Sequence, residues 1–288
     1  MGRGEDEPRV AVHIRRPCEA LQGYITFFYF VAVDGPLTDF LYPEWGNVRF
    51  ALDGAWNVLM TGYESATPPD GALFGPTDRP GRIVTAAGRC FGFGMTPLGW
   101  HRLVGGDASA MANRIAPLGD RLGFDGLTML RALRDEPDEG AAVAMVERAV
   151  FERLAATPPV SERVRAVDRA LRMRPSEVNA FAATVGLSER TLSRLCLKVF
   201  GFAPKRLLRL QRFLDTLGHI RSAVGEPVID AIHDYFDQAH FYRDFRDFMG
   251  MTPGAYQRAP RRLMAAAAAE QVRAGVSLSF RLPPQPGE

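Results

Sequence analysis

Cysteine is scarce in this sequence, and its scarcity excludes two kinds of stabilisation. Cys18, Cys90 and Cys196 are far apart, odd in number and without CxxC spacing. We therefore expect neither a disulfide framework nor a zinc site. Long apolar runs are missing as well, because no stretch has the ~18 uninterrupted apolar residues of a membrane-spanning helix. The opening MGRGEDEPRV lacks the apolar segment of a signal peptide, so we expect a cytoplasmic protein.

Signs of catalysis are also missing. No nucleophile elbow, P-loop or dinucleotide fingerprint occurs in the sequence. A metal site of the cupin type would need clustered histidines and carboxylates on adjacent strands, whereas the five histidines are scattered. We therefore predict no catalytic residue, no metal ligand and no cofactor, and we expect that the protein is not an enzyme.

What the sequence does contain is an uneven distribution of charge. The 288 residues are 47% hydrophobic and 24% charged, as in an ordinary globular protein long enough for two domains. Residues 160–262 hold 18 Lys and Arg against 11 Asp and Glu, a net charge of +7. The whole chain carries only +2, so the remainder is acidic. This asymmetry indicates that the C-terminal part meets a polyanion.

The first half of the chain has the pattern of short β-strands. Between residues 20 and 100, runs rich in β-branched and aromatic residues are separated by Gly, Pro and Asp clusters. We expect a β-rich domain over residues 1–155, built as an antiparallel barrel or sandwich. Helical spacing follows it. The trailing helices are expected at 107–118, 125–134 and 138–155, and a linker at 155–160.

From residue 161 onward the pattern predicts helices only. Gly and Pro breaks divide residues 161–262 into about seven helices, which gives a two-domain α+β fold. The segment 204–220 is expected to be one helix, ~25 Å long. A rigid helix of that length could hold one DNA-contacting helix at each of its ends, in successive major grooves ~34 Å apart. Residues 265–288 are alanine-rich and then proline-rich, so we expect a mobile tail there that begins as a frayed helix.

The stretch VNAFAATVGLSERTLSRLCLKVFG has the pattern of a helix-turn-helix. Gly186 stands where the turn requires a positive φ, and Ser188 can cap the following helix. Apolar spacing predicts that this second helix buries Leu192, Leu195 and Val199. Its opposite face is then polar and basic, as a major-groove helix requires. The outward residues are Arg190, Ser193, Arg194 and Lys198.

A second such unit lies in DQAHFYRDFRDFMGMTPGAY. Asp237 is the expected N-cap, and three phenylalanines recur at helical spacing to form one buried stripe. Gly250 is expected to end the helix and Pro253 to begin a short last one. The face opposite the phenylalanines carries Gln238, Ala239, Tyr242, Arg243 and Arg246.

This second stretch closely resembles the second helix-turn-helix signature of the AraC/XylS family of bacterial transcription regulators. SEVNAFAATVGLSERTLSRLCLKVFG is similar to the first signature, and the resemblance covers about residues 161–260. It implies a sequence-specific regulator of transcription that reads double-stranded DNA with both recognition helices. The implied base readers are Arg190, Ser193, Arg194, Gln238, Ala239, Tyr242 and Arg243. Lys198 and Arg246 are expected to meet phosphates.

One position departs from the family pattern. Asp234 stands where these regulators usually have a glycine in the turn of the second motif. Aspartate tolerates the left-handed backbone region at a cost, so the second unit is expected to dock less rigidly.

The N-terminal part more faintly resembles the sensory domain of such regulators. In the family this domain often has a cupin-like barrel that binds a small-molecule effector or mediates dimerisation. The resemblance therefore adds an effector, a homodimer partner and RNA polymerase as candidate partners. Two other functions stay open at this point. One is a cupin-like enzyme with a helical appendage, and the other is a scaffold whose helices bind protein.

Overall fold

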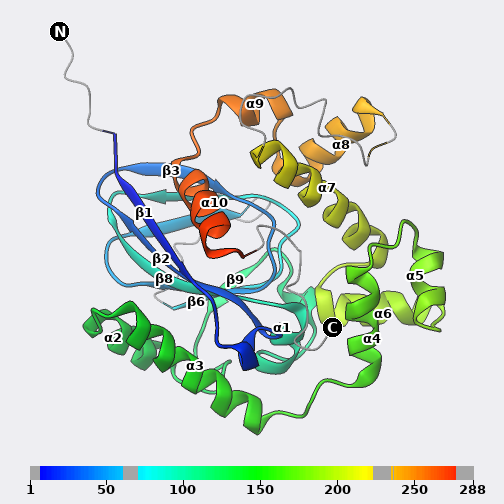
Figure 1. The fold of residues 1–288 in the computed structure, drawn as a ribbon, viewed down its shortest axis with the longest axis horizontal. Helices are drawn as coiled ribbons and strands as arrows, with labels where there is room; N and C mark the ends of the chain where they lie inside the picture. The colour runs from blue at the N-terminus through cyan, green and yellow to red at the C-terminus, as the bar shows by residue number, and fades with distance from the viewer. Residues whose placement is uncertain (1–6, 61–70, 223–234, 236, 277–288) are drawn as a thin grey trace.

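The computed structural model describes residues 7–60, 71–222, 235 and 237–276. Nine strands lie in the N-terminal half and are followed mainly by helices (Figure 1). The predicted α+β fold with a β-rich N-terminal part and a helical C-terminal part is confirmed. The cupin-like form of the β-rich part stays a prediction.

The strands form two antiparallel sheets. The larger has the order β1-β2-β8-β4-β6-β9 and the smaller has the order β3-β7-β5. The strands of the larger sheet are β1 (Val10–Arg15), β2 (Ile25–Val33), β4 (Asn47–Ala51), β6 (Ala72–Phe74), β8 (Gly88–Met95) and β9 (Ile115–Pro117). Those of the smaller sheet are β3 (Leu37–Leu41), β5 (Trp56–Met60) and β7 (Gly81–Thr85).

The space between the sheets is an apolar core. Alternation places Trp56, Val58 and Met60 of β5 on the buried face of the smaller sheet. They share one cluster with Val31 and Cys90, which are paired on β2 and β8 of the larger sheet. Every second side chain of these strands is apolar and points to the same face, so the two sheets pack face to face through these side chains.

Helices cover the other face of the larger sheet. They are α1 (Pro97–Leu103), α2 (Gly126–Asp135) and α3 (Glu139–Ala156), and a short 3-10 turn, η1 (Glu19–Leu21), precedes β2. Phe50, Phe91 and Phe93 pack against these helices in a second cluster. The helices expected at 125–134 and 138–155 are thus confirmed as α2 and α3.

The helix expected over 107–118 is wrong. That segment contains a 3-10 turn, η2 (Ala108–Met111), and then strand β9. Asn113 takes a left-handed φ of 57°, which ends any helical path, and β9 pairs with β6. The pairing of Leu73 with Ala116 is a long-range contact that local spacing does not reveal.

The C-terminal part is helical throughout its regular elements. Its helices are α4 (Glu162–Arg172), α5 (Val178–Thr184), α6 (Glu189–Phe200), α7 (Pro204–Ser222), α8 (Gln238–Met249), α9 (Pro253–Arg258) and α10 (Arg262–Ala274). The long helix expected over 204–220 is confirmed as α7. Across the described ranges, no helix combines the length and the apolar character needed to cross a bilayer.

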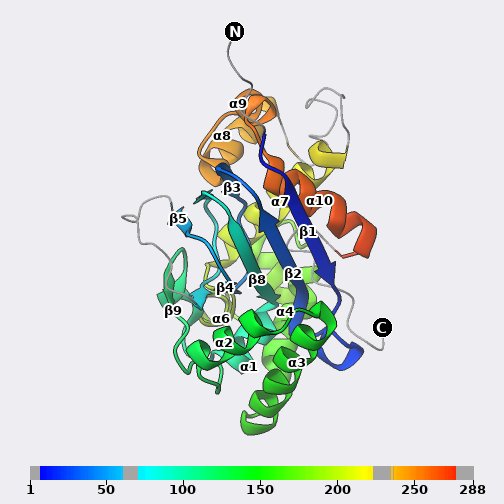
Figure 2. The ribbon, with the colours of Figure 1, turned by 90° about the vertical axis from the view of Figure 1, so that its left-hand side faces the viewer.

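Helix α10 is packed against the N-terminal part, where a frayed helix was expected. Residues 265–274 belong to this helix, which lies along β1 in both ribbon views (Figures 1 and 2). Leu263 is buried in the core between the sheets, and the backbone N–H of Met264 donates to the Asp39 carboxylate at 3.0 Å. At the other end, the Arg16 guanidinium donates to the carbonyl oxygen of Ala274 at 2.7 Å. The alanine-rich sequence is thus a helix that returns to the N-terminal part. The remainder of the expected tail, 277–288, lies outside the described residues.

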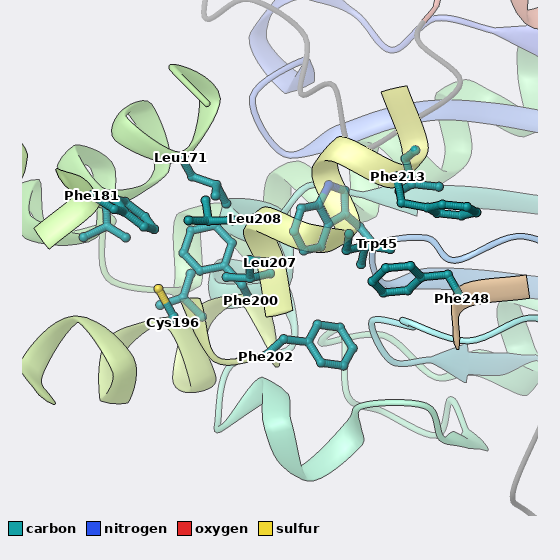
Figure 3. Packing of buried hydrophobic residues seen from close by; sticks show 14 of the residues in the cluster. Trp45, Leu171, Phe181, Cys196, Phe200, Phe202, Leu207, Leu208, Phe213 and Phe248 are labelled. Carbon is teal, nitrogen blue, oxygen red and sulfur yellow. The ribbon is translucent and has the colours of Figure 1, made fainter. Parts of the chain in front are cut away.

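The N-terminal and helical parts share a continuous apolar core. Trp45, from the segment between β3 and β4, packs with Phe200 at the end of α6, with ring centroids 6.0 Å apart. Figure 3 shows Trp45 among Phe200, Phe213 and Phe248 of the helical part. The helices are therefore held against the β-rich part by burial of large aromatic side chains.

Candidate nucleic-acid interface

The first helix-turn-helix is formed by α5 and α6. Gly186 has a φ of +63°, and the Ser188 hydroxyl accepts from the backbone N–H of Thr191 at 3.3 Å. Both features agree with the sequence pattern, because a left-handed turn and an N-cap are local requirements. Phe181 and Ala182 of α5 are buried beneath α6, so the two helices cross closely.

The buried stripe of α6 is turned slightly from the expected one. Leu192, Cys196 and Val199 are almost fully buried, whereas Leu195 is only partly buried at the edge of the core. The spacing of four and then three residues passes through Cys196, whose small apolar side chain serves as a core residue. Burial raises the pKa of the Cys196 thiol to about 12.

The outward face of α6 matches the expectation at three of its four positions. Arg190, Arg194 and Lys198 are exposed and recur every four residues, so they form one stripe along the helix. Ser193 is half-buried beside this stripe. An exposed row of cations on a helix behind a tight turn is the arrangement that suits insertion into a major groove.

The helix of the second unit is α8. The Asp237 carboxylate accepts from the backbone N–H of His240 at 2.6 Å, as the expected N-cap. Phe241, Phe245 and Phe248 are completely buried. The last two lie with ring centroids 5.4 Å and 5.0 Å from Phe213 of α7. Aromatic packing therefore fixes α8 against α7.

The outward face of α8 is exposed to solvent. All five of its expected residues are exposed: Gln238, Ala239, Tyr242, Arg243 and Arg246. Tyr242 packs its ring against Phe241 at 5.9 Å and remains 39% exposed, so an aromatic ring stands at the surface. The helix ends at Gly250, where φ is +66°, and Thr252 caps α9 ahead of Pro253.

Two acidic residues on α8 have a role that the sequence pattern did not reveal. Asp244 is 1% exposed and accepts from the Arg209 guanidinium of α7 at 2.6 Å. Asp247 accepts from Arg209 at 2.9 Å and also pairs with Arg206. Partial burial would raise the pKa of Asp247, but hydrogen bonds and charge from Arg206 and Arg209 outweigh it and hold that pKa below its usual range. In the sequence, the two arginines are three residues apart, and so are the two aspartates. This shared spacing was the signal that could have indicated ion pairs between α7 and α8.

The basic residues of the helical part therefore divide into two groups. Some arginines are paired with carboxylates inside the part, such as Arg172 with Asp168 and Arg174 with Asp215. The cations on the outward faces of α6 and α8 form no ion pair with any other residue that the structure describes. These are Arg190, Arg194, Lys198, Arg243 and Arg246.

The second helix-turn-helix is only partly within the described residues. Asp234, which stands where a glycine was expected, lies outside them. Its effect on the docking of this unit stays a prediction. Tyr235 is described, and its buried ring lies 5.3 Å from that of Phe241.

The sequence of this region matches a known type of domain. Residues 181–259 match the family described as a helix-turn-helix domain. This segment is an AraC-type helix-turn-helix domain. Such a domain indicates DNA-binding transcription regulation. No curated protein sequence matches the chain.

Similar solved structures include two of ToxT from Vibrio cholerae. An apo form of ToxT has a TM-score of 0.44 at 8% identity and covers 86% of this chain and 96% of its own. ToxT bound to an unsaturated fatty acid has a TM-score of 0.41 at 10% identity, with 89% and 96% covered. The AraC-like transcriptional activator CuxR has a TM-score of 0.28 at 14% identity, with 77% and 90% covered.

The surroundings of the AraC-type domain include the N-terminal helix α1. His101 of α1 is half-buried, and burial lowers the pKa of its imidazole, as do the charges of Lys198 and Arg102. Lys198 is therefore close enough to the N-terminal part to act on it electrostatically. Within the described ranges, no three His, Cys, Asp or Glu side chains are grouped to hold a metal ion.

Proposed function

We propose that the protein binds a specific double-stranded DNA sequence by inserting α6 and α8 into two successive major-groove segments. In this proposal residues 161–262 are the DNA-binding domain, and residues 1–155 are a sensory or dimerisation domain. Arg190, Ser193, Arg194, Gln238, Ala239, Tyr242 and Arg243 contact bases. Lys198 and Arg246 contact phosphates and set the register of the helices on the duplex.

One observation carries the proposal. Arg172 on α4 and Arg206 and Arg209 on α7 are paired with carboxylates. The five cations on the outer faces of α6 and α8 have no such partner among the described residues. A guanidinium in a structural ion pair is neutralised, but an exposed unpaired one contributes its full charge to a phosphate. Unpaired cations thus line the outward faces of both helices that follow the turns.

The length of α7 agrees with reading two segments. Its 19 residues correspond to ~28 Å at the rise of an α-helix. Successive major grooves on one face of a duplex recur at ~34 Å, a separation that a rigid helix of this length can support. Phe213 on α7 packs against α8, so α7 and α8 move together.

Selection of bound duplexes from a random pool tests the proposal directly. We expect two sequence blocks separated by about one helical turn, 10–10.5 base pairs centre to centre. We also expect affinity to fall steeply with salt, because at least Lys198 and Arg246 release counterions. Recovery of no enriched sequence, or of a single short block, would contradict the proposal.

A further inference from the structure

One loop of the N-terminal part contacts both recognition units. It comprises residues 75–80, between β6 in the larger sheet and β7 in the smaller sheet. All of its residues except Arg79 are buried. Its backbone is fixed within the N-terminal part by hydrogen bonds from Gly75 to Arg114 and from Thr77 to Glu44, at 3.0 Å and 2.8 Å. It is therefore a rigid surface on which the helices rest.

Two prolines of this loop lie against the glycines that end the recognition helices. Gly201 is the C-cap of α6 with a φ of +83°, and a Cβ there would lie 2.6 Å from Cγ of Pro76. Gly250 is the C-cap of α8 with a φ of +66°, and a Cβ there would lie 3.6 Å from Cγ of Pro80. Each glycine thus serves both as a left-handed cap and as a contact point for the same loop.

Between the prolines, Asp78 makes an ion pair with the helical part. Its carboxylate accepts from Nε of Arg206 on α7 at 2.5 Å, and its carbonyl oxygen accepts from Nη2 at 3.3 Å. Asn113 holds the same carboxylate in place with a donated hydrogen bond of 2.7 Å. The other arm of Arg206 pairs with Asp247 of α8, and its guanidinium lies 4.1 Å from the Phe248 ring centroid. Arg206 therefore connects the loop to the second recognition helix.

We infer that the loop 75–80 sets the relative position of the two recognition helices, with Asp78 and Arg206 as positioning residues. The inference rests on the proposed reading of two major-groove segments. Helix α7 joins the two units through their apolar cores, and the loop touches the C-terminal end of each recognition helix. The loop contacts the helices at Pro76, Asp78 and Pro80. Three separate contacts fix both the distance between the two recognition helices and their relative rotation, whereas α7 by itself fixes only the distance.

The position of the loop gives this contact a regulatory consequence. Because the loop joins β6 of one sheet to β7 of the other, a change in the spacing of the sheets would be transmitted to its prolines and to Asp78. The N-terminal part can therefore change how α6 and α8 are presented without contacting DNA itself. Discrete packing of this kind is the usual way in which small shifts at one site alter another.

The test uses the full chain and duplexes that carry the two selected sequence blocks. The spacing between the blocks is varied by single base pairs, and affinity is measured for each spacing and for a duplex with one block. Asp78→Asn and the double variant Pro76→Ala with Pro80→Ala are compared with the unaltered protein. Asp53→Asn is the matched control, because it removes a carboxylate from an N-terminal ion pair with Arg89 that does not reach the helices.

We expect the unaltered protein and Asp53→Asn to prefer one spacing strongly. In Asp78→Asn and in the proline variant that preference should shrink about three- to tenfold, with single-block affinity unchanged. The single-block result separates loss of positioning from loss of folding. An unchanged spacing preference in both variants would overturn the inference while leaving the proposed function standing. Failure of the unaltered protein to bind two blocks would overturn both.

Discussion

The hydroxyl groups of Tyr42 and Tyr256 lie 2.8 Å apart in a buried hydrogen bond, although 214 positions separate them in the sequence. Tyr42 belongs to the N-terminal part and Tyr256 to α9 of the helical part. The guanidinium of Arg261 lies 4.1 Å from the Tyr256 ring centroid and covers the pair. The two parts are therefore joined by a specific polar contact inside their apolar interface.

This pair gives the first prediction. Tyr42→Phe or Tyr256→Phe should each lower the free energy of unfolding by about 1 kcal/mol, because each removes the buried hydrogen bond between the two hydroxyls. The double variant should lose clearly less than the two single losses combined, since one hydrogen bond is counted in both. Urea denaturation of the four proteins measures the cycle. Strictly additive losses would show that the two hydroxyls do not interact.

The second prediction concerns Gly201. Gly201→Ala should destabilise the protein more than Gly186→Ala, although both glycines have a positive φ. Backbone strain of about 1–2 kcal/mol applies to both. Only Gly201 adds a collision with Pro76, because no atom lies within 4 Å of a Cβ placed on Gly186. Thermal unfolding compares the two variants.

A rescue variant isolates that collision. Pro76→Ala removes the Cγ atom that approaches Gly201, so combining it with Gly201→Ala should reduce the loss to the size seen for Gly186→Ala. Equal losses for the two single glycine variants would instead show that Pro76 does not press on the end of α6.

The third prediction concerns the pH dependence of stability at Asp39, which accepts from the first turn of α10. Burial raises the pKa of this carboxyl, and the backbone N–H groups of Met264 and Phe40 offset only part of that effect. The folded protein then binds the proton more tightly than the unfolded chain does. The contribution of Asp39 to stability must therefore fall as pH rises from about 3.9, the unfolded value, through the raised folded pKa.

Asp39→Asn removes this titration and keeps an oxygen that can accept from Met264. The unfolding free energy of the unaltered protein minus that of Asp39→Asn should decrease with rising pH across this window. Taking the difference cancels other carboxyls, such as Asp247, whose lowered pKa gives the opposite slope. A difference that increased with pH would mean that Asp39 is stabilised as the anion.

The features of α8 could be predicted because they are local. The cap at Asp237, the phenylalanine stripe and the stop at Gly250 each depend on residues within one or two turns. The outward residues of α6 and α8 follow from the same periodicity. Leu195 shows where this reasoning loses accuracy, since either it or Cys196 satisfies helical spacing and only tertiary packing selects the cysteine.

The contacts that position these helices could not be predicted in this way. Asp39 and Met264 are 225 residues apart, and Asp78 and Arg206 are 128 apart, so no spacing rule connects them. The run of alanines in α10 has the composition of a frayed end, and apolar packing against β1 makes it an ordered helix. Charge counting also does not reveal which cations reach the surface, and Arg206 and Arg209 are used inside the fold.

The fourth prediction separates base readers within the proposed interface. Arg194→Ala or Arg243→Ala should each weaken binding to the selected duplex by about 1–3 kcal/mol and relax specificity at one base position. Each arginine is exposed on a different recognition helix, so the relaxed positions should fall in different blocks. Repeating the duplex selection with each variant measures this. Relaxation in the same block for both would contradict the assignment of one helix to each block.

The fifth prediction concerns the phosphate contacts at Lys198 and Arg246. Replacing either with alanine should weaken binding to all sequences by a similar factor, because a phosphate carries no base identity. The slope of log affinity against log salt concentration should become shallower by about 0.9 for each lost contact. Arg89→Ala is the control, because this exposed arginine lies on β8 in an ion pair with Asp53, away from both recognition helices. If Arg89→Ala changed the slope as much as Lys198→Ala does, the salt dependence would reflect the overall charge of the protein. A shallower slope for Lys198→Ala and Arg246→Ala alone would instead locate the counterion release at the two outward faces.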